Sequence, residues 1–486
     1  MGARQYKQGI VREQGYLLPA TLDEYVAADN PVQAIDVYVA SLDLEALGFR
    51  NTEGERTAGQ PAFPPAALLK LYLYGYLHRV RSSRQLEQET YRNLEVMWLV
   101  EGLHPGYKTI ADFRKNNLKS LRAVNQDFVQ ACKELDLFGR ELVAIDGSYF
   151  RGNVNKGKIY TGARLQRALA RIAQHIEAYL HALEAADQSE AGAAEEVTGL
   201  KEKLATWQAR RAQHQARLER LRASGATQLA EGDEDARLLV KAGQCVAGYN
   251  VQVAVDAKHK LLVLAEATQA GNDMHQLAPM AQGAQAALAV DHLTVTADSG
   301  YFNVQGIQAC EAAQITPYVP EPHKTNQARL QGRFAREDFR YDPAANCYYC
   351  PAGHTLAYYY AQTKAGKTTW HYSSSAVTCA ACPLRGRCLA PQSPTRRVCR
   401  WEHEAVIDAH RARMAQDGRA MMATRATLAE HPFGTLKLWC GWRHFLMRGL
   451  AKVQAELSLL MLSYNFKRML AALGLQAWRA YCLQRA

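Results

Sequence analysis

The sequence predicts a mixed α/β fold in which a helical N-terminal region precedes a core that contains a β-sheet. Residues 1–140 read mostly as helices, whereas from Glu141 onward short apolar runs closed by Gly and polar residues alternate with helical segments. Two segments break this alternation, a helical one at 162–222 and a cysteine-rich one at 320–402. We therefore expect one domain over residues 1–140 and a second over 141–486 that carries both segments as inserts.

The N-terminal region is expected to be helical because its apolar residues recur at helical spacing. One helix should begin at Pro64 and Pro65, since proline is favoured in the first turn, and another should begin near Thr109. Three tyrosines of the first helix could form a base-stacking stripe, although packing in a core is the interpretation we favour. They are Tyr72, Tyr74 and Tyr76.

The second domain should contain a mixed sheet, because strands are followed by alternating helices and strands. Strands are expected at 142–152, 293–302 and 316–322, helices at 273–288 and 304–314, and two strands joined by a turn at 248–269.

The helical insert has two leucine-rich stripes at three- and four-residue steps, which predict a hairpin of helices with its turn at 187–195. Such a hairpin is either an antiparallel arm or a dimer contact, and the pattern favours neither.

The charge of the chain indicates a polyanionic partner. The formal net charge is +11 and the pI is near 9.0. We favour nucleic acid over a solvated basic face, since residues 433–486 hold one acid, Glu456, and eight basic side chains. The basic residues are Lys437, Arg443, Arg448, Lys452, Lys467, Arg468, Arg479 and Arg485. The chain has neither a long apolar run nor a secretion signal, so we expect a cytoplasmic protein.

Two acids lie where a metal-dependent site would need them. Asp146 closes the apolar run LVAI and precedes a glycine, and Asp298 has a similar place in LTVTADSGYF. Two divalent cations about 3.5–4 Å apart can cleave and join phosphodiesters, and Mg²⁺ prefers carboxylate oxygens. An acid at the end of a strand can also be only a cap or a turn residue. Two of them in one α/β core favour a functional role.

Four segments in order, AIDGSYFRG, GYNVQVAVDA, TADSGYF and AEHPFGTLK, resemble the DDE transposases of bacterial insertion sequences. The resemblance runs through nearly the whole chain, and the order of the motifs is more specific than any one motif. It implies an RNase H-like sheet, with one Asp on the first strand, one after the fourth strand and a Glu on a later helix. By motif these catalytic residues, which would hold Mg²⁺ or Mn²⁺, are Asp146, Asp298 and Glu430.

The resemblance also implies DNA contacts near the third acid. Lys437 lies seven residues after Glu430, as in the family's motif, and two helical turns would place both on one face. A basic residue is expected four positions before Glu430, where this chain has Ala426, next to Arg425. The side chains expected to contact DNA are Lys437, Arg425, Arg443 and Arg448.

Four other acids compete for the position of the third ligand. Asp256 reads as a turn residue, Asp273 as a helix cap and Glu456 as a salt-bridge partner, and Glu266 lies in the same core. Glu430 is the ligand we favour.

The cysteine-rich insert predicts a structural zinc site of the zinc-ribbon kind. It contains two Cys-x-x-Cys pairs, Cys347 with Cys350 and Cys379 with Cys382, and four thiolates match tetrahedral zinc. Either Cys388 or His354 could replace one of these ligands. Four thiolates leave no open position on the metal, so this zinc would not be catalytic.

Together these features predict a transposase that hydrolyses the ends of its element and joins the exposed 3′-hydroxyls to target DNA. The helical N-terminal domain would bind the terminal inverted repeats, the pairing of two ends implies a homodimer on DNA, and the protein would act on the bacterial nucleoid. The alternatives are a metal-dependent nuclease with the same core and an inactive DNA-binding regulator. A nucleophilic hydrolase is disfavoured, since the chain has no Gly-x-Ser-x-Gly motif.

Overall fold

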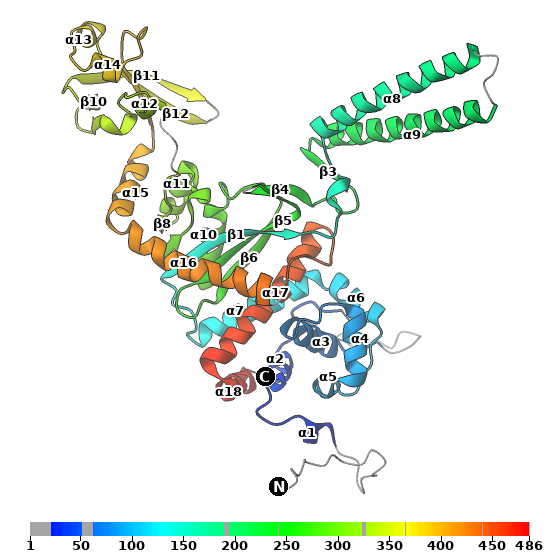
Figure 1. Cartoon of the computed structure of the whole chain (residues 1–486). Helices are drawn as coiled ribbons and strands as arrows, with labels where there is room; N and C mark the ends of the chain where they lie inside the picture. Colours follow the sequence, from blue (N-terminus) through cyan, green and yellow to red (C-terminus); the bar gives the residue numbers. More distant parts are fainter. Residues whose placement is uncertain are drawn as a thin grey trace, which may run out of the picture. The chain divides into compact units, whose positions relative to one another are not determined.

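The computed structural model describes residues 21–50, 62–188, 194–241, 243–322, 327–364, 366–439 and 441–485 (Figure 1). The chain divides into two compact units. The first unit comprises Met1–Gly139, Gly147–Gly271 and Glu430–Ala486, and the second comprises Arg140–Asp146 and Asn272–Ala429. Both contain helices and strands, so the mixed α/β class is confirmed.

The N-terminal region of the first unit is helical, as predicted. Helix α3 (Pro65–Leu77) begins at a proline, and its three tyrosines are buried, which confirms that they pack in the core. The hydroxyl of Tyr72 donates to the carbonyl of Ile110 at 2.7 Å, and Arg114 donates to the hydroxyl of Tyr76 at 3.1 Å. The neighbouring helices are α1 (Leu22–Tyr25), α2 (Val32–Ala40), α4 (Ser83–Arg92), α5 (Leu94–Leu99), α6 (Tyr107–Asn116) and α7 (Leu118–Glu134).

The strands of the first unit are centred on β5 (Gln244–Asp256), which pairs antiparallel with β4 (Arg237–Lys241) and β6 (Leu262–Thr268). The later part of β1 (Leu142–Arg151) passes close to β5. A Cβ atom on Gly248 would lie 2.0 Å from the carbonyl oxygen of Phe150, so only glycine permits this approach.

In the second unit, the first residues of β1 pair in parallel with β7 (Leu293–Thr296), and β7 pairs in parallel with β8 (Ile315–Tyr318). Helices α10 (Leu277–Leu288) and α11 (Val304–Ala312) precede and follow β7, close to their predicted positions. The strand order is β4-β5-β1-β7-β8, with β6 also paired to β5. The core sheet is therefore mixed, as the sequence predicts.

Two long helices occupy the segment in which a helical hairpin was expected. Helices α8 (Gly162–Gln188) and α9 (Ala194–Ser224) lie side by side (Figure 1). The rings of His175 and Trp207 stack between them with centroids 4.5 Å apart. Most of the expected turn lies outside the described residues. The strands β2 (Ile159–Thr161) and β3 (Gln228–Ala230) pair antiparallel at the base of the two helices.

Residues 327–402 of the second unit, which we call the cysteine-rich module, contain an antiparallel sheet of their own. Its strand order is β13-β12-β11-β10-β9. The core of the module consists of Phe339, Tyr348, Leu356, Tyr372 and Val398. The strands are β9 (Arg340–Asp342), β10 (Cys347–Tyr349), β11 (Thr355–Lys364), β12 (Lys367–Ser373) and β13 (Arg397–Trp401). The short helices are α12 (Gln327–Leu330), η3 (Arg336–Asp338), α13 (Ala376–Ala380) and α14 (Arg385–Cys388).

Helix α17 (Leu450–Leu473) of the first unit is largely buried, although it lies in the basic segment 433–486. Its residues Val453–Phe466 are all buried. Two of its amide side chains bind the outer edge of β6: Gln454 bonds to the backbone of Ala265 and Ala267, and Asn465 to both polar groups of Leu262. The helix thereby satisfies backbone groups on the side of β6 away from β5.

The remaining elements are α15 (Glu404–Gln416), α16 (Gly418–Gly434), the π-helical segment η4 (Thr435–Trp439) and α18 (Leu475–Arg485). Within the described part of the chain, no helix is long and apolar enough to cross a membrane.

Candidate active site

Two strands of the second unit bring Asp146 and Asp298 to the same level. Strands β1 and β7 are parallel, and their last paired residues are Ala144 and Thr296. Each aspartate lies two residues beyond its paired residue, so the two acids are in register at the point where the strands part. Strand β1 continues to Arg151, so Asp146 lies within the strand and not at its end as the sequence indicated.

A single guanidinium group contacts both carboxylates. Nη2 of Arg425, on α16, lies 3.1 Å from Oδ1 of Asp146 and 3.8 Å from Oδ2 of Asp298. All three side chains are at least partly shielded from water, which strengthens their attraction relative to an exposed ion pair. The two aspartates thus form a place for positive charge, and their oxygens suit a hard divalent cation.

The local backbone fixes one oxygen of Asp298. The acid caps the short turn η2 (Ser299–Tyr301), and its Oδ1 accepts a hydrogen bond from the backbone N–H of Gly300 at 2.8 Å. A Cβ atom on Gly300 would lie only 2.9 Å from that oxygen. The glycine after the acid therefore leaves room for this carboxylate orientation.

Tyr301 lies behind these carboxylates and was not indicated by the sequence. Its side chain is fully buried, and burial raises the pKa of the phenol well above its usual value. The nearby charges of Asp273, Asp146 and Asp298 raise the pKa further, while Arg425 acts in the opposite direction. One buried hydroxyl therefore lies within electrostatic reach of three acids and the arginine.

Asp273 is a third acid of this region in the second unit. It is buried, and its Oδ2 lies 4.0 Å from the point that a Cβ of Gly300 would occupy. The sequence predicted that it caps a helix. Asp273 lies three residues before Gln276, the N-cap of α10, and its carbonyl accepts a hydrogen bond from the backbone N–H of Gln276 at 2.9 Å. Asp273 thus lies beside the candidate site, within electrostatic reach of Tyr301.

Glu430 and Lys437 belong to the first unit. Glu430 is exposed on α16, where the first unit resumes. Lys437 lies in η4, and its ammonium donates to the hydroxyl of Ser148 at 2.5 Å and to the carbonyl of Tyr149 at 2.8 Å. The two aspartates lie together in the second unit. The prediction that Glu430 is the third metal ligand rests on its sequence motif alone.

Arg448 borders a polar pocket of about 510 Å³ in the first unit. Its Nε donates to the carbonyl of Asn153 at 3.0 Å, and Arg151 and Lys158 also line the pocket. Arg443 is exposed, and its carbonyl accepts a hydrogen bond from the backbone N–H of Arg151. Several basic side chains thus gather around an open pocket, an arrangement suited to phosphate.

Glu456 is a structural acid. It is fully buried in α17 and accepts hydrogen bonds of 3.0–3.1 Å from the backbone N–H groups of Leu446 and Met447. Its position on the buried helix directs it to these backbone donors. Its charge also raises the pKa of Arg114, so a cationic partner lies within electrostatic reach.

Asp256 and Glu266, the two other candidates for the third metal ligand in the first unit, also have polar partners. Asp256 accepts hydrogen bonds from the backbone N–H groups of Gly139 and Lys258, both at 2.9 Å, which agrees with a turn residue. Glu266 forms an ion pair with Arg122 at 2.6 Å. Burial raises the pKa of Glu266, and the charge of Arg122 opposes that rise.

The expected zinc ligands are not arranged around one ion. Among the residues that the structure describes, no three His, Cys, Asp or Glu side chains form a group that could hold a metal ion. Cys347 lies within β10, next to Tyr348, which packs in the module's core beside Cys350. Because successive strand residues face opposite sides, Cys347 faces away from that core. The set Cys347, Cys350, Cys379 and Cys382 is therefore not supported by the geometry.

Three other thiols of the module lie within electrostatic reach of Cys388. Burial raises the pKa of Cys388, and the neighbouring thiols of Cys379, Cys350 and Cys382 raise it further, against the opposing charge of Arg396. Cys350 and Cys388 also pack against the same aromatic core. Cys388 is therefore nearer to the Cys-x-x-Cys thiols than the sequence required, although the described side chains form no metal-binding group.

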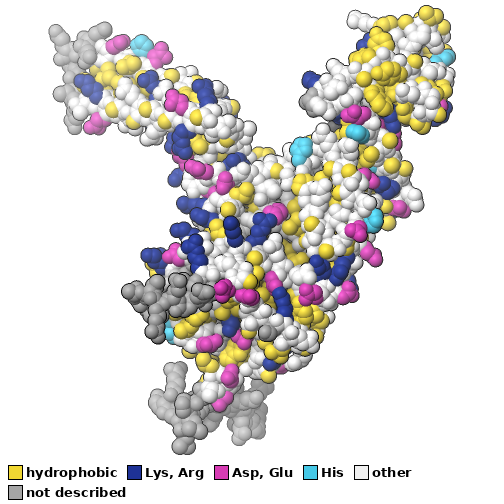
Figure 2. All heavy atoms as spheres, turned by 180° about the vertical axis from the view of Figure 1, so that it is seen from behind, with side chains coloured by type: hydrophobic (Ala, Val, Ile, Leu, Met, Phe, Trp, Pro, Cys, Tyr) yellow, Lys and Arg dark blue, Asp and Glu magenta, His cyan; other side chains and the backbone are white. Residues whose placement is uncertain are grey.

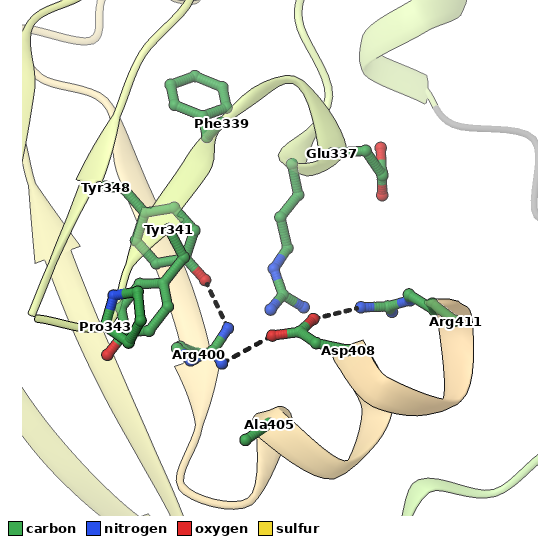
Figure 3. Close-up of a pocket in the computed structure, with 10 residues that line it drawn as sticks. Glu337, Phe339, Tyr341, Pro343, Tyr348, Arg400, Ala405, Asp408 and Arg411 are labelled. Carbon is green, nitrogen blue, oxygen red and sulfur yellow. Dashed lines mark hydrogen bonds and ion pairs between the residues drawn. The ribbon is translucent and has the colours of Figure 1, made fainter. Parts of the chain in front are cut away.

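A cavity of about 570 Å³ lies between the cysteine-rich module and α15 (Figure 3). Three arginines line it, but each faces its own carboxylate: Arg336 lies 2.8 Å from Glu404, Arg400 lies 2.7 Å from Asp408, and Arg411 lies 3.1 Å from Glu321. Because these charges are balanced, the cavity is better explained as the junction of the module with α15 than as a phosphate site.

Two family models match the chain. The Transposase DDE domain matches residues 349–470, a range that includes Arg425, Glu430 and Lys437. The Transposase domain (DUF772) matches residues 20–116 of the helical N-terminal region. No curated protein matches the chain.

Among solved structures, the chain is similar to the piggyBac transposase in a cryo-EM structure of its synaptic complex with hairpin DNA. The two share 9% sequence identity, the alignment covers 94% of this chain and 79% of the other, and the TM-score is 0.31. At that TM-score the likeness carries no argument about fold or function.

Proposed function

Since the chain is a DDE-type transposase of the insertion-sequence kind, we propose that it cleaves the ends of its element and joins the exposed 3′-hydroxyls to target DNA. The proposed catalytic residues are Asp146, Asp298 and Glu430. The observation that carries the proposal is the register of the two aspartates on parallel strands, where both contact the guanidinium of Arg425. We propose that the protein acts on the bacterial nucleoid.

The strand order supports an RNase H-like core. Strand β1 is central, the antiparallel pair β5 and β6 is on one side of it, and the parallel strands β7 and β8 are on the other. Asp146 is on the first strand and Asp298 follows β7, which is the arrangement that the family resemblance implies.

In the proposed mechanism, the acidic side chains would bind the metal ions and the basic side chains would bind the DNA. When bound, divalent cations would activate the attacking oxygen and stabilise the leaving oxygen of the phosphodiester. Asp146, Asp298 and Glu430 would hold these cations, and the N–H of Gly300 keeps one oxygen of Asp298 in a fixed orientation. Lys437 and Arg425 would neutralise DNA phosphates near the reacting bond.

The DNA ends would be bound by the helical N-terminal region together with the basic pocket beside Arg448 and the exposed Arg443. Such contacts are made mainly with phosphates, so the affinity should fall steeply as the salt concentration rises. Because two ends must be paired before they are joined, the active form on DNA would be a homodimer.

For structural zinc we propose the ligands Cys350, Cys379, Cys382 and Cys388. Cys350 and Cys388 pack against the same aromatic core, and Cys379, Cys350 and Cys382 each raise the pKa of Cys388. The four side chains would have to close around the ion, because the described residues form no group that could hold a metal as they stand. Zinc measured by mass spectrometry in the purified chain should be about one equivalent, lost in Cys388→Ser and retained in Cys347→Ser. Loss in Cys347→Ser with retention in Cys388→Ser, or no zinc in the wild type, would contradict this set.

The test of the proposed function is cleavage of labelled DNA that carries the element's ends, in Mg²⁺, by the wild type and three variants. Asp146→Asn, Asp298→Asn and Glu430→Gln should each cut at least about 10³-fold more slowly while binding the ends with unchanged affinity. Glu234→Gln, at an exposed acid of the first unit, is the matched control and should cut at the wild-type rate.

The outcomes separate the alternatives. Cleavage without joining to target DNA would favour the nuclease, and end binding without cleavage in any divalent metal would favour the regulator. Wild-type cleavage by Glu430→Gln would exclude Glu430 as the third ligand. Asp273→Asn would then be the next variant, because that buried acid lies beside Gly300 and Tyr301.

A further inference from the structure

One face of the cysteine-rich module displays aromatic rings that no part of the proposed chemistry uses. Strand β11 carries three consecutive tyrosines, and Tyr359 and Tyr360 are 62% and 38% exposed. The register of β11 shifts between Tyr358 and Tyr360, so Tyr359 is an extra, bulged residue. In Figure 2 hydrophobic side chains, tyrosine included, gather on the surface of this module at the upper right.

The rings form a row across the sheet. Tyr360 pairs with His371 on β12, and His371 pairs with Cys399 on β13, so the three side chains share one face. The rings of Tyr360 and His371 are stacked, with centroids 4.3 Å apart and planes 7° from parallel. The ring of Tyr359 lies 5.3 Å from that of Tyr360.

Positive charge accompanies the rings. The guanidinium of Arg397 lies 5.7 Å from the centre of the Tyr359 ring. Over residues 327–402 the sequence has eleven Lys and Arg against four Asp and Glu, an excess of seven positive charges. Three of these acids accept hydrogen bonds from the module's own backbone at Ala335, Ala344 and Thr368, so they are engaged within the fold.

We propose that this surface, formed by Tyr359, Tyr360, His371 and Arg397, binds unpaired DNA bases. Exposed aromatic rings stack on bases irrespective of their identity, and adjacent cations hold the backbone of a single strand. A duplex offers only phosphates to such a surface, because its bases are stacked on one another. Phosphates alone would need the cations and not the rings.

The proposal rests on the proposed action on DNA, and it adds a substrate class, single-stranded or locally opened DNA. Cleaving and joining of strands produces free ends at which bases can leave the helix. The surface formed by Tyr359, Tyr360, His371 and Arg397 belongs to the same unit as the two aspartates and would hold such a strand by stacking on its bases.

Binding to a fluorescent single-stranded oligonucleotide and to the corresponding duplex tests the proposal, with the full-length chain in EDTA so that no strand is cut. The double variant Tyr359→Ala/Tyr360→Ala should bind the single strand about 10- to 100-fold more weakly and the duplex within about twofold of the wild type. Tyr359→Phe/Tyr360→Phe keeps the rings and should retain both affinities.

Trp207→Ala is the matched control. The ring of Trp207 stacks on His175 with centroids 4.5 Å apart, and the guanidinium of Arg210 lies 4.9 Å from its centre, but it lies on α9 of the first unit, outside the surfaces proposed to bind DNA. Its loss should leave single-strand binding unchanged. Iodouracil placed in the oligonucleotide should photo-crosslink to Tyr359 or Tyr360 in the wild type.

Three results would overturn the proposal. Equal loss for single strand and duplex would show that only phosphates are bound, and no loss for either would show that the surface serves another partner, such as a protein. Equal loss in the Phe variant would show that the hydroxyls and not the rings matter. A wild type that never cleaves element ends, yet loses single-strand binding in the Ala variant, would refute the proposed function alone.

Discussion

Two sets of acids in this molecule are neutralised in different ways. In the first unit, Glu456 accepts hydrogen bonds from the backbone of Leu446 and Met447, whereas in the second unit Asp146 and Asp298 contact one guanidinium group. Backbone donors are fixed by the fold, but a guanidinium on a flexible side chain can be replaced by another cation. The partner of a carboxylate, more than its burial, therefore separates a structural acid from an acid that is available for chemistry.

The largest effect should be the loss of stability when an acid of the first set is replaced by its amide. Glu456→Gln places an amide N–H₂ group against a backbone donor, and hydrogen bonds to charged groups contribute about 1.5–3 kcal/mol each. We expect the free energy of unfolding in urea to fall by about 3 kcal/mol, whereas Asp298→Asn should change it by less than about 1 kcal/mol. Similar losses of unfolding free energy in both variants would show that the two sets of acids do not differ in their structural role.

The second effect concerns the guanidinium at the aspartate pair. Arg425→Ala removes the positive charge that competes with a metal ion, so the affinity for Mn²⁺ in the absence of DNA should rise about tenfold. Isothermal titration measures it, and Asp146→Asn/Asp298→Asn should bind no Mn²⁺ at this site. Arg419→Ala, at an exposed position on the same helix, should leave the affinity unchanged. A weaker affinity in Arg425→Ala would show that the arginine organises the carboxylates for the metal.

The smallest effect should come from crowding Asp298. In Gly300→Ala the new Cβ would meet Oδ1 of Asp298 at 2.9 Å, so the carboxylate must shift by a few tenths of an ångström. DNA cleavage should slow about three- to tenfold, with a change in unfolding free energy below about 1 kcal/mol. Gly306→Ala is the control, since its nearest neighbour would lie 3.7 Å away. Equal rates in the two variants would mean that the orientation of Asp298 is not critical.

The strands that carry the two aspartates could be predicted, because an apolar run closed by an acid and a glycine is a local signal. The apolar runs before Asp146 and Asp298 form β1 and β7, and Gly300 leaves room for the carboxylate of Asp298. The contact of Arg425 with both acids could not be predicted, because it depends on where α16 meets the ends of two strands.

Other features could not be predicted because they arise from tertiary packing. Tyr301 and Asp273 have no motif, and their role near the aspartates comes from burial and proximity. Helix α17 carries polar residues that would normally face water, but Gln454 and Asn465 are buried against the edge of β6. Cys347 belongs to a Cys-x-x-Cys pair in the sequence, yet the alternation within β10 turns it away from Cys350.

The cover that α17 provides for the edge of β6 has a consequence for the nascent chain. Asn465 and Gln454 follow the β6 residues that they bind by 203 and 187 positions. A ribosome adds about 5–20 residues per second, so the strand leaves the ribosome roughly 10–40 s before its cover. During that interval, neighbouring chains on one messenger RNA expose the same unprotected edge to one another. A chaperone that holds this strand, or slow initiation that spaces the ribosomes, would raise the yield of folded protein.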